Sequence, residues 1–453
     1  GGGGGGGGGG GPPPPGGELC YNSLSQQGGA GPGGGSLVCR LSYFTPEWKE
    51  GYHMIQLSQR MVDLGTARSE IREAFAFAQA RAAEVGPENV DDFSIGNPSV
   101  PAPETVAQAV HDLVDSVDPI QLHGYTPAQG DGSVRQALAD DLNRRYGTAY
   151  GPDDFYLTAG AAGALCCVLS ALGCPGDVFL TFAPYFPEYK VFVESAGGTL
   201  TAVPADLEDF QIDFAAFEAA LSPQVKGVII NSPNNPTGVV YSEATIRRLG
   251  QTLAEKSKEY GHPIWLISDE PYREIVYQEA PLPWVPHYYA NTLVCYSYSK
   301  SLSLPGQRIG YVLVPPQAQE AGLVYAAVCG AGRALGYVCA PSLFQLVAAR
   351  CAGQTADMAV YRRNRDLLLD ALRQMGYTCA QPDGAFYLFP RTPEPDAGAF
   401  CQRARKYDLV LVPGDSFGCP GHVRISYCVP TEQIQRALPK FRALAREYGL
   451  IGG

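Results

Sequence analysis

A lysine among small hydroxyl residues is the first feature of this sequence that suggests chemistry. Lys300 lies in the segment 296–310, which reads YSYSKSLSLPGQRIG. Most lysines are solvated, so an ordinary surface lysine is the simpler interpretation of Lys300 on its own. In a pocket, however, burial lowers the pKa of the amine and lets it attack an aldehyde. Arg308, further along the same segment, could hold a phosphate group through paired hydrogen bonds.

Two other segments carry polar side chains of a matching kind. Residues 231–238 read NSPNNPTG, which is typical of a turn, although the amide of Asn235 could donate to a phenolate-type oxygen. Residues 268–272 read SDEPY. Asp269 could be a helix cap or a surface acid, or it could be the counter-ion of a protonated ring nitrogen, with Tyr272 supplying a hydroxyl group.

A run of small residues suggests an anion site. Residues 157–165 read LTAGAAGAL, which predicts a strand that turns into an apolar helix. The first turn of such a helix has free backbone amides that can bind an anion. Close packing alone would also explain the small residues.

These segments follow short apolar runs, which read as buried strands separated by helices. That alternation predicts an α/β fold with three layers, in which helices cover both faces of a mostly parallel sheet. Ligands bind at the carboxyl ends of the strands in such sheets. The predicted strands are 155–157, 178–182, 228–230, 264–268, 292–296 and 309–314, and the predicted helices are 105–117, 133–146, 160–172, 189–196 and 243–260.

The remaining segments predict a smaller α+β domain and a tail. A helix over 361–375, strands over 386–389 and 423–426, and a helix over 432–448 follow the sheet, while a helix over 70–85 and an extended piece over 92–96 precede it. Residues 1–50 are rich in Gly and Pro, with little to bury, so they are expected to be disordered. The expected division is a large domain over 104–344 and a small domain formed by 51–103 and 345–453.

Composition indicates which partners and which compartment are expected for this protein. The net charge of −12 has no compensating basic stripe, which argues against nucleic acid. No apolar run is long enough to span a membrane, and no secretory signal is evident. The 13 cysteines include Cys166, Cys167 and Cys339 in apolar runs, which is typical of free thiols in a reducing compartment. A cytoplasmic protein is expected.

Taken together and in this order, the segments resemble the class I and II aminotransferases of fold type I, the group that includes aspartate and aromatic aminotransferases. The resemblance covers roughly residues 70–448, and its most specific parts are the run 235–238, Asp269 with Tyr272, and Ser297 and Lys300 with Arg308. It implies a pyridoxal 5′-phosphate (PLP) enzyme. The implied reaction moves an amino group from an α-amino acid (aspartate, aromatic or broad specificity) to a 2-oxo acid.

The resemblance also implies roles for single residues around the cofactor ring. Lys300 forms a Schiff base with the cofactor and later moves the substrate proton. Asp269 pairs with the pyridinium nitrogen, and Asn235 and Tyr272 bond the 3′-oxygen. Phe186 in the run 183–187 stacks on the ring, and the neighbouring Tyr185 is a weaker match.

Further roles concern the phosphate group, the substrate and a second subunit. The resemblance implies that the backbone amides of Ala161 and Ala162, assisted by Ser297 and Arg308, bind the phosphate. Tyr125 would reach the phosphate of the other subunit, which implies a homodimer with shared sites. Arg424 would clamp the substrate carboxylate, and the backbone of Gly96 would lie beside the substrate. An ordinary salt-bridged arginine is the alternative for Arg424.

One departure and several alternatives remain. The family often has a charged or hydroxyl side chain where this chain has Ala161 and Ala162. The same apparatus serves C–S lyases, other β-eliminating enzymes, decarboxylases and cyclopropane-forming synthases, since fold and cofactor do not fix the reaction. A cofactor-sensing regulator would need a DNA-binding module before residue 50, which the glycine tract cannot form. Arg333 lies roughly where some relatives hold a distal carboxylate, but it does not align cleanly.

Overall fold

The computed structural model describes residues 57–452 apart from 68 and 280. The predicted disordered tail, residues 1–50, lies outside the described residues. The chain divides into two compact units, residues 1–62 and 63–453. Helix α1 (Gln59–Thr66) begins in the first unit, and everything described below lies in the second.

The largest element of the second unit is a sheet of seven strands in the order β2-β8-β7-β6-β5-β3-β4. Only β8 runs antiparallel to its neighbours, so the sheet is mostly parallel. This confirms the predicted α/β fold and each of the predicted strands, to which the structure adds β4. The strands are β2 (Phe155–Thr158), β3 (Val178–Ala183), β4 (Thr199–Pro204), β5 (Val225–Asn231), β6 (Trp265–Asp269), β7 (Thr292–Ser297) and β8 (Gly310–Leu313).

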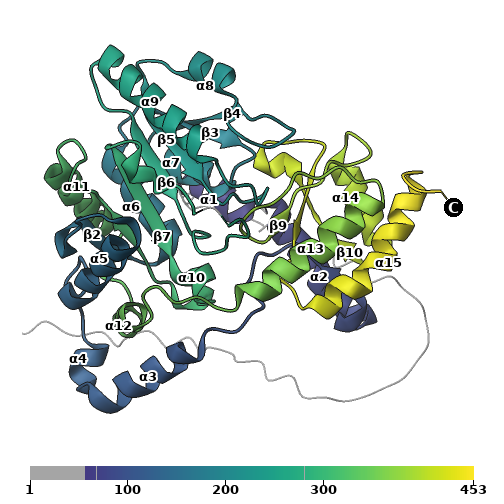
Figure 1. Ribbon diagram of the computed structural model, residues 1–453, viewed down its shortest axis with the longest axis horizontal. Coiled ribbons are helices and arrows are strands. Elements are labelled where there is room, and N and C mark those ends of the chain that lie inside the picture. The colour runs from purple at the N-terminus through teal and green to yellow at the C-terminus, as the bar shows by residue number, and fades with distance from the viewer. Residues whose placement is uncertain (1–56, 68, 280, 453) are drawn as a thin grey trace, which may run out of the picture. The chain divides into compact units, whose positions relative to one another are not determined.

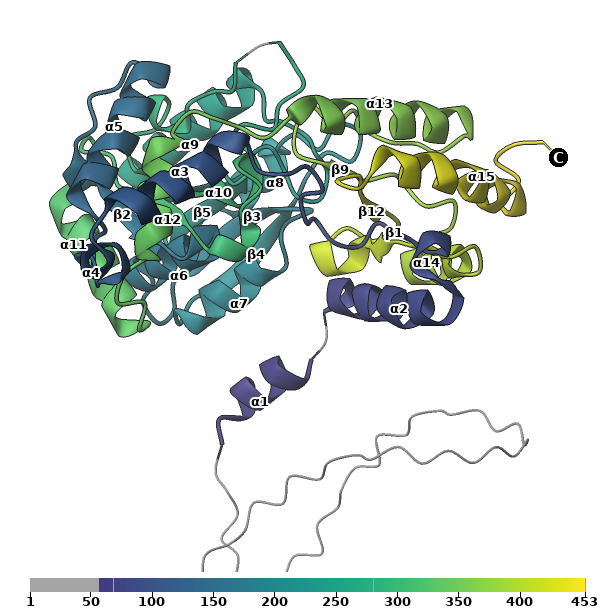
Figure 2. The same cartoon turned by 90° about the horizontal axis from the view of Figure 1, so that it is seen from below.

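Helices cover both faces of this sheet because alternate strand residues point to opposite sides. Ile229 and Ile267 pack with α6 (Gly160–Leu172), α7 (Glu188–Ser195) and α11 (Ala321–Ala334), whereas Val228 and Leu266 pack with α8 (Phe214–Ala220) and α9 (Glu243–Tyr260). Figure 2 shows α6 and α7 on one side of the strands and α9 on the other. Four more helices cover the same face of the sheet as α9. They are α3 (Glu104–Ser116), α4 (Pro119–His123), α5 (Gly132–Tyr146) and α12 (Ser342–Arg350).

A second group of elements surrounds two small sheets (Figure 1). One is antiparallel with the order β11-β12-β9, and the other pairs β1 with β10. The extended piece predicted over 92–96 is mostly loop, since β1 ends at Asp92. The elements are α2 (Glu70–Val85), β1 (Asp91–Asp92), α13 (Met358–Gln374), β9 (Tyr387–Leu388), α14 (Ala397–Arg405), β10 (Leu409–Val410), β11 (Val412–Pro413), β12 (Val423–Ser426) and α15 (Thr431–Glu447). The division into domains at 103/104 and 344/345 stays a prediction.

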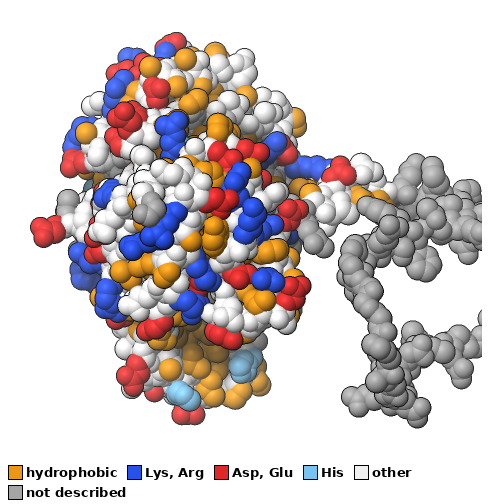
Figure 3. Space-filling model, turned by 90° about the vertical axis from the view of Figure 1, so that its right-hand side faces the viewer, with side chains coloured by type: hydrophobic (Ala, Val, Ile, Leu, Met, Phe, Trp, Pro, Cys, Tyr) orange, Lys and Arg blue, Asp and Glu red, His pale blue; other side chains and the backbone are white. Residues whose placement is uncertain are grey.

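Thiols and surface charges complete the description. The cysteines among the described residues are free, with Cys167 buried and Cys166 and Cys339 half-buried. Within the same residues, none of the helices combines the length and the apolar character that crossing a bilayer requires. On the face that includes α13 and α15, Figure 3 shows acidic and basic side chains interspersed.

Candidate functional site

The carboxyl ends of three neighbouring strands bring the predicted residues together. Strand β5 ends at Asn231 and β6 ends at Asp269, and these two residues are register partners. Strand β7 ends at Ser297, whose hydroxyl oxygen accepts a hydrogen bond from the backbone N–H of Ser299 (3.1 Å) and caps a one-turn helix, α10 (Tyr298–Ser301). Lys300 lies in this turn, so the cap fixes the point from which its side chain starts.

A cavity of about 320 Å³ opens at these strand ends. All of the predicted site residues line it except Tyr125. The lining residues are Ile71, Ile95, Gly96, Ala161, Ala162, Leu165, Phe186, Asn231, Asn235, Asp269, Pro271, Tyr272, Ser297, Ser299, Lys300, Pro305, Arg308, Tyr387 and Arg424.

The Lys300 amine is held in the cavity in a reactive state. Its Nζ donates a hydrogen bond to the carbonyl oxygen of Gly96 (2.6 Å) and lies 5.5 Å from the centre of the Phe386 ring. Burial lowers the pKa of Lys300 to about 8, and the nearby Arg424 and Arg308 also lower it. About a tenth of the amine is therefore neutral, and nucleophilic, at pH 7, which is far more than for a solvated lysine.

Asp269 is a buried carboxylate with one unsatisfied oxygen. Its Oδ2 accepts a hydrogen bond from the Tyr189 hydroxyl group (2.6 Å), but its Oδ1 is buried without a partner. Burial raises the pKa of Asp269 to about 7. An unpaired buried oxygen facing a cavity is costly unless a ligand supplies a donor or a positive charge. The site therefore suits a ligand with a protonated nitrogen at this point.

The start of α6 and Arg308 form a cradle suited to an anion. Ala161 and Ala162 lie in the first turn of α6, where backbone amides have no partner within the helix. Arg308 Nη2 donates to the carbonyl oxygen of Ala159 (3.2 Å), and Nη1 lies 3.5 Å from Ser299 Oγ. Gly160 has a φ of +77°, and a Cβ atom there would approach Arg308 Nη2 to 2.7 Å. Glycine is thus required for the arginine to lie against the helix start.

Arg424 is a buried cation that also lines the cavity. Its Nη1 donates to Asn235 Oδ1 (3.0 Å) and its Nη2 to the carbonyl oxygen of Ser94 (2.5 Å), while Nε is buried without a partner. Burial lowers the pKa of Arg424. No carboxylate pairs with it among the described contacts, so the ordinary salt bridge considered as an alternative is absent there. The guanidinium group is placed to receive an anionic ligand.

Three residues from the sequence lie elsewhere. Tyr125 is 90% exposed and does not line the cavity of its own chain. Arg333 lies in the last turn of α11 and is exposed, and Tyr185 is half-buried and does not line the cavity.

Several residues of the site were missed from the sequence. Tyr189 on α7 provides the hydrogen bond to Asp269, and Ile71 on α2 contributes an apolar wall. Tyr387 on β9 lines the cavity, with its hydroxyl oxygen 2.7 Å from that of Tyr272. Ile71 and Tyr387 come from segments outside the large sheet, and Tyr189 follows β3 in a helix whose sequence indicated only packing against the sheet.

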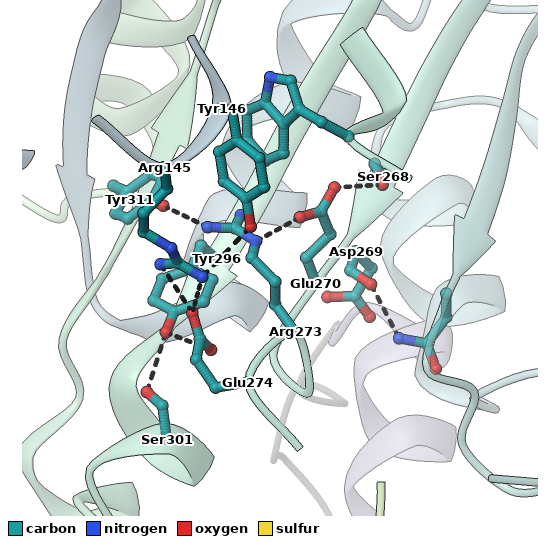
Figure 4. A network of polar contacts seen from close by, with 12 residues as sticks. Arg145, Tyr146, Ser268, Asp269, Glu270, Arg273, Glu274, Tyr296, Ser301 and Tyr311 are labelled. Atoms are coloured by element: carbon teal, nitrogen blue, oxygen red, sulfur yellow. Dashed lines mark hydrogen bonds and ion pairs between the residues drawn. The ribbon is translucent and has the colours of Figure 1, made fainter. Parts of the chain in front are cut away.

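A buried ionic network lies behind the turn that carries Asp269 and Tyr272 (Figure 4). Arg273 Nε donates to Glu270 Oε2 (2.6 Å) and Nη1 donates to the Tyr311 hydroxyl oxygen (3.0 Å). Glu270 Oε1 accepts from the Ser268 hydroxyl group (2.7 Å). The network thus joins both ends of the turn to the strands around it.

Comparison with known proteins identifies the family of this chain. The family model for aminotransferase class I and II matches residues 88–441. An aspartate/prephenate aminotransferase from Thermus thermophilus is 30% identical over 81% of this chain and 94% of its own length. An aspartate aminotransferase from Thermotoga maritima is 30% identical over 80% of this chain and 93% of its own length.

The solved structures that resemble this chain are also aminotransferases. The crystal structure of an amino transferase from Eubacterium rectale is 55% identical to this chain, with a TM-score of 0.86, and covers 87% of it with the whole of its own chain. An aspartate aminotransferase from Thermus thermophilus, solved with maleate, is 27% identical and has a TM-score of 0.75 over 86% of this chain and all of its own. This protein therefore belongs to the class I and II aminotransferase family and is a PLP-dependent transaminase.

Proposed function

We propose that the cavity at the ends of β5, β6 and β7 binds PLP and that Asp269 and Lys300 are its two anchoring side chains. The observation that carries the proposal is the unpaired, buried Oδ1 of Asp269 in the same cavity as the Lys300 amine. The ring nitrogen of the cofactor would supply the missing partner of Oδ1, and its aldehyde would meet the amine. When bound, PLP withdraws electrons from the carbon that loses its proton.

Other side chains would hold the cofactor from its remaining sides. The phosphate group suits the cradle of Ala161, Ala162 and Arg308, with Ser297 beside it. The amide of Asn235 and the hydroxyl group of Tyr272 would bond the 3′-oxygen. Phe186 lines the cavity and is held there by an edge-to-face pair with Tyr189, 5.7 Å between ring centres, and its ring would stack on that of the cofactor.

Arg424 and Gly96 would place the amino acid against the cofactor. Arg424 has an unpaired Nε and lines the cavity, so the α-carboxylate group of the substrate can pair with it. The backbone of Gly96 lies beside the Lys300 amine, which is 2.6 Å from the Gly96 carbonyl oxygen. Holding the substrate at two points would fix the direction of its Cα–H bond, and the neutral amine of Lys300 would accept that proton and later give it up.

The amino donor is proposed from the relatives and from the charges of the cavity. The relatives named above are an aspartate/prephenate aminotransferase and an aspartate aminotransferase, so aspartate is the first donor to test, followed by aromatic amino acids. Among the described residues that line the cavity, the cations are Lys300, Arg308 and Arg424. A distal carboxylate would need a cation from outside this set, and the exposed Arg333 of a second subunit is one candidate.

We further propose a cytoplasmic homodimer. Tyr125 is exposed and lies outside the cavity of its own chain, as a residue that completes the site of a second subunit would. The proposed large domain is 104–344, and the small domain comprises 51–103 and 345–453. Light scattering of the purified protein would give the mass of a dimer, and a monomer would contradict shared sites.

Absorbance spectra of the PLP-loaded protein test the central proposal. We expect a band at the visible–ultraviolet edge that the Lys300→Ala variant lacks and that Lys190→Ala, at an exposed lysine, retains. Aspartate, glutamate, tyrosine and alanine are then added singly, and a true donor converts the band and releases its 2-oxo acid. If the Lys300→Ala variant kept the band, Lys300 would not be the anchor of the cofactor. Release of pyruvate together with ammonia would indicate a lyase.

A further inference from the structure

Tyr387 occupies a central position in the cavity that the roles above do not use. Its hydroxyl oxygen lies 2.7 Å from the hydroxyl oxygen of Tyr272. Its ring lies under the guanidinium group of Arg424, 4.9 Å from the ring centre. A Cβ atom at position 96 would overlap the Tyr387 hydroxyl oxygen, so Gly96 is packed directly against it. Tyr387 therefore touches Tyr272, which is assigned to the cofactor, and Arg424, which is assigned to the substrate carboxylate. It also touches Gly96, whose carbonyl oxygen accepts the hydrogen bond from Lys300.

The surroundings hold Tyr387 firmly in this place. The side chain is 2% exposed, and its ring packs edge-on against Tyr272 with 5.7 Å between ring centres. Phe386, the preceding residue, packs against the same ring at 5.0 Å. Strand β9 pairs with β12, the strand that carries Arg424, through the partners Tyr387 and Ser426. Tyr387 and Arg424 thus belong to one small sheet, while Tyr272 belongs to the turn after β6.

We propose that Tyr387 is a positioning residue of the transamination site, which aligns the Tyr272 hydroxyl group through its own hydroxyl group and supports Arg424 through its ring. The inference rests on the proposed function, because it takes Tyr272 to face the 3′-oxygen of PLP and Arg424 to face the substrate carboxylate. It adds a coupling between the cofactor side and the carboxylate side of the cavity.

The direction of the hydrogen bond gives the hydroxyl group its role. An anionic 3′-oxygen is a stronger acceptor than a neutral phenol, so Tyr272 donates to the cofactor and Tyr387 donates to Tyr272. A donor that itself accepts a hydrogen bond is a better donor, especially in a site shielded from water. Burial raises the pKa of Tyr387 to about 12, which keeps its proton in place.

The ring has a separate role. The guanidinium carbon of Arg424 lies 4.9 Å from the ring centre of Tyr387 and 5.0 Å from that of Phe417. Aromatic faces attract a cation that has lost its water, and they leave its N–H groups free for the ligand. Removal of the ring is therefore expected to disturb carboxylate binding, whereas removal of the hydroxyl group alone is not.

The first experiment measures the dissociation constant of PLP by titrating the cofactor-free protein and following protein fluorescence. We expect Tyr387→Phe to raise this constant about fivefold, the effect of losing one hydrogen bond. Tyr377→Phe is the matched control, because Tyr377 is a buried tyrosine outside the cavity whose hydroxyl group has no partner, and it should bind PLP as the unchanged protein does.

A double substitution tests whether Tyr387 acts through Tyr272. The variant with both tyrosines replaced by phenylalanine should bind PLP as weakly as Tyr272→Phe alone, since the second hydroxyl group then has nothing to align. Additive losses would overturn the proposal, because Tyr387 would then act on the cofactor independently or through general packing. An unchanged dissociation constant for Tyr387→Phe would overturn it as well.

A third variant separates the ring from the hydroxyl group. In the PLP-loaded protein, Tyr387→Leu should raise the KM for the amino donor at least about threefold above that of Tyr387→Phe, since only leucine removes the face beneath Arg424. Equal KM values would refute the role of the ring. If the unchanged protein fails to bind PLP through Lys300, the proposed function itself fails, and that result is distinct from every outcome above.

Discussion

Replacing Asp269 by asparagine should stabilise the cofactor-free protein at neutral pH while weakening its hold on PLP. Burial raises the pKa of Asp269 from 3.8 to about 7. That difference is about 3, and at about 1.4 kcal/mol for each pKa unit the ionised carboxylate costs the folded state on the order of 4 kcal/mol. Asparagine carries no charge and keeps an oxygen that can accept from the Tyr189 hydroxyl group.

The sign of the pH dependence follows from proton binding. Between pH 4 and pH 7 the unfolded chain has released the Asp269 proton and the folded chain still holds it, so the free energy of unfolding falls as the pH rises. Above pH 7 the folded chain has also released the proton, so Asp269 causes no further fall in the free energy of unfolding. A protonated ring nitrogen next to Oδ1 would supply the missing charge, so PLP should restore stability to the unchanged protein and much less to Asp269→Asn.

Urea unfolding at pH 5 and pH 8, with and without PLP, measures both effects. Without PLP, the stability of Asp269→Asn relative to the unchanged protein should rise by about 3 kcal/mol between the two pH values, since about 2 pH units of the loss lie above pH 5. With saturating PLP, the unchanged protein should be more stable than Asp269→Asn. If the free energies of unfolding of the two proteins changed equally between pH 5 and pH 8, Asp269 would not be an unpaired buried charge.

Three further predictions concern the rest of the cavity. Gly160→Ala adds a Cβ atom that would lie 2.7 Å from Arg308 Nη2, at a φ of +77°, so it should cost about 1–3 kcal/mol in urea unfolding and raise the dissociation constant of PLP. Arg424→Lys cannot keep both of its hydrogen bonds and should raise the KM for the amino donor at least about tenfold, with the absorbance of bound PLP unchanged. Because burial lowers the pKa of Lys300 to about 8, the rate of PLP uptake should rise with pH and reach half its maximum near that value.

The first of these has a control within the chain, and the other two have an outcome that would contradict them. Gly147→Ala has a left-handed φ of +66° but no atom within 4 Å, so it isolates the backbone strain from the contact with Arg308. An Arg424→Lys enzyme that kept its KM would show that the carboxylate binds elsewhere. A pH-independent rate of PLP uptake would contradict a titrating amine at Lys300.

The sequence was sufficient to predict the site where the chemistry lies at strand ends. Strands β5 and β6 are runs of apolar residues that stop at Asn231 and Asp269, and in a parallel sheet such ends must meet at one edge. The lysine and Arg308 follow the next strand in the same way. These positions depend on the order of elements along the chain, which an alternation of apolar runs and helices reveals.

Residues that other elements bring to the site, into the cavity or behind it, were not predictable on these grounds. Tyr189 and Asp269 are 80 residues apart, and only the packing of α7 on the sheet joins them. Tyr387 stands in an apolar run, where a tyrosine is read as part of the core, yet its hydroxyl group meets that of Tyr272, 115 residues away. Ile71 comes from α2, before the sheet begins. Such contacts depend on packing angles that no local pattern specifies.

The turn after β6 explains how these distant pieces are kept in register. Asp269 and Tyr272 face the cavity, while Glu270 and Arg273 face away and form an ion pair with 6% and 3% exposed side chains (Figure 4). A buried ion pair adds little net stability, but breaking it strands a charge, so the turn is confined to one conformation.

The same network continues to the lysine. Glu274 Oε2 accepts from the Tyr296 hydroxyl group (2.7 Å), whose oxygen lies 2.9 Å from Ser301 Oγ, and Ser301 is the residue after Lys300. The proposed counter-ion and the proposed nucleophile are therefore braced from behind by one set of buried polar contacts. Since a misplacement of either group by about 1 Å can cost about 100-fold in rate, a rigid support on the side away from the ligand is what this chemistry requires.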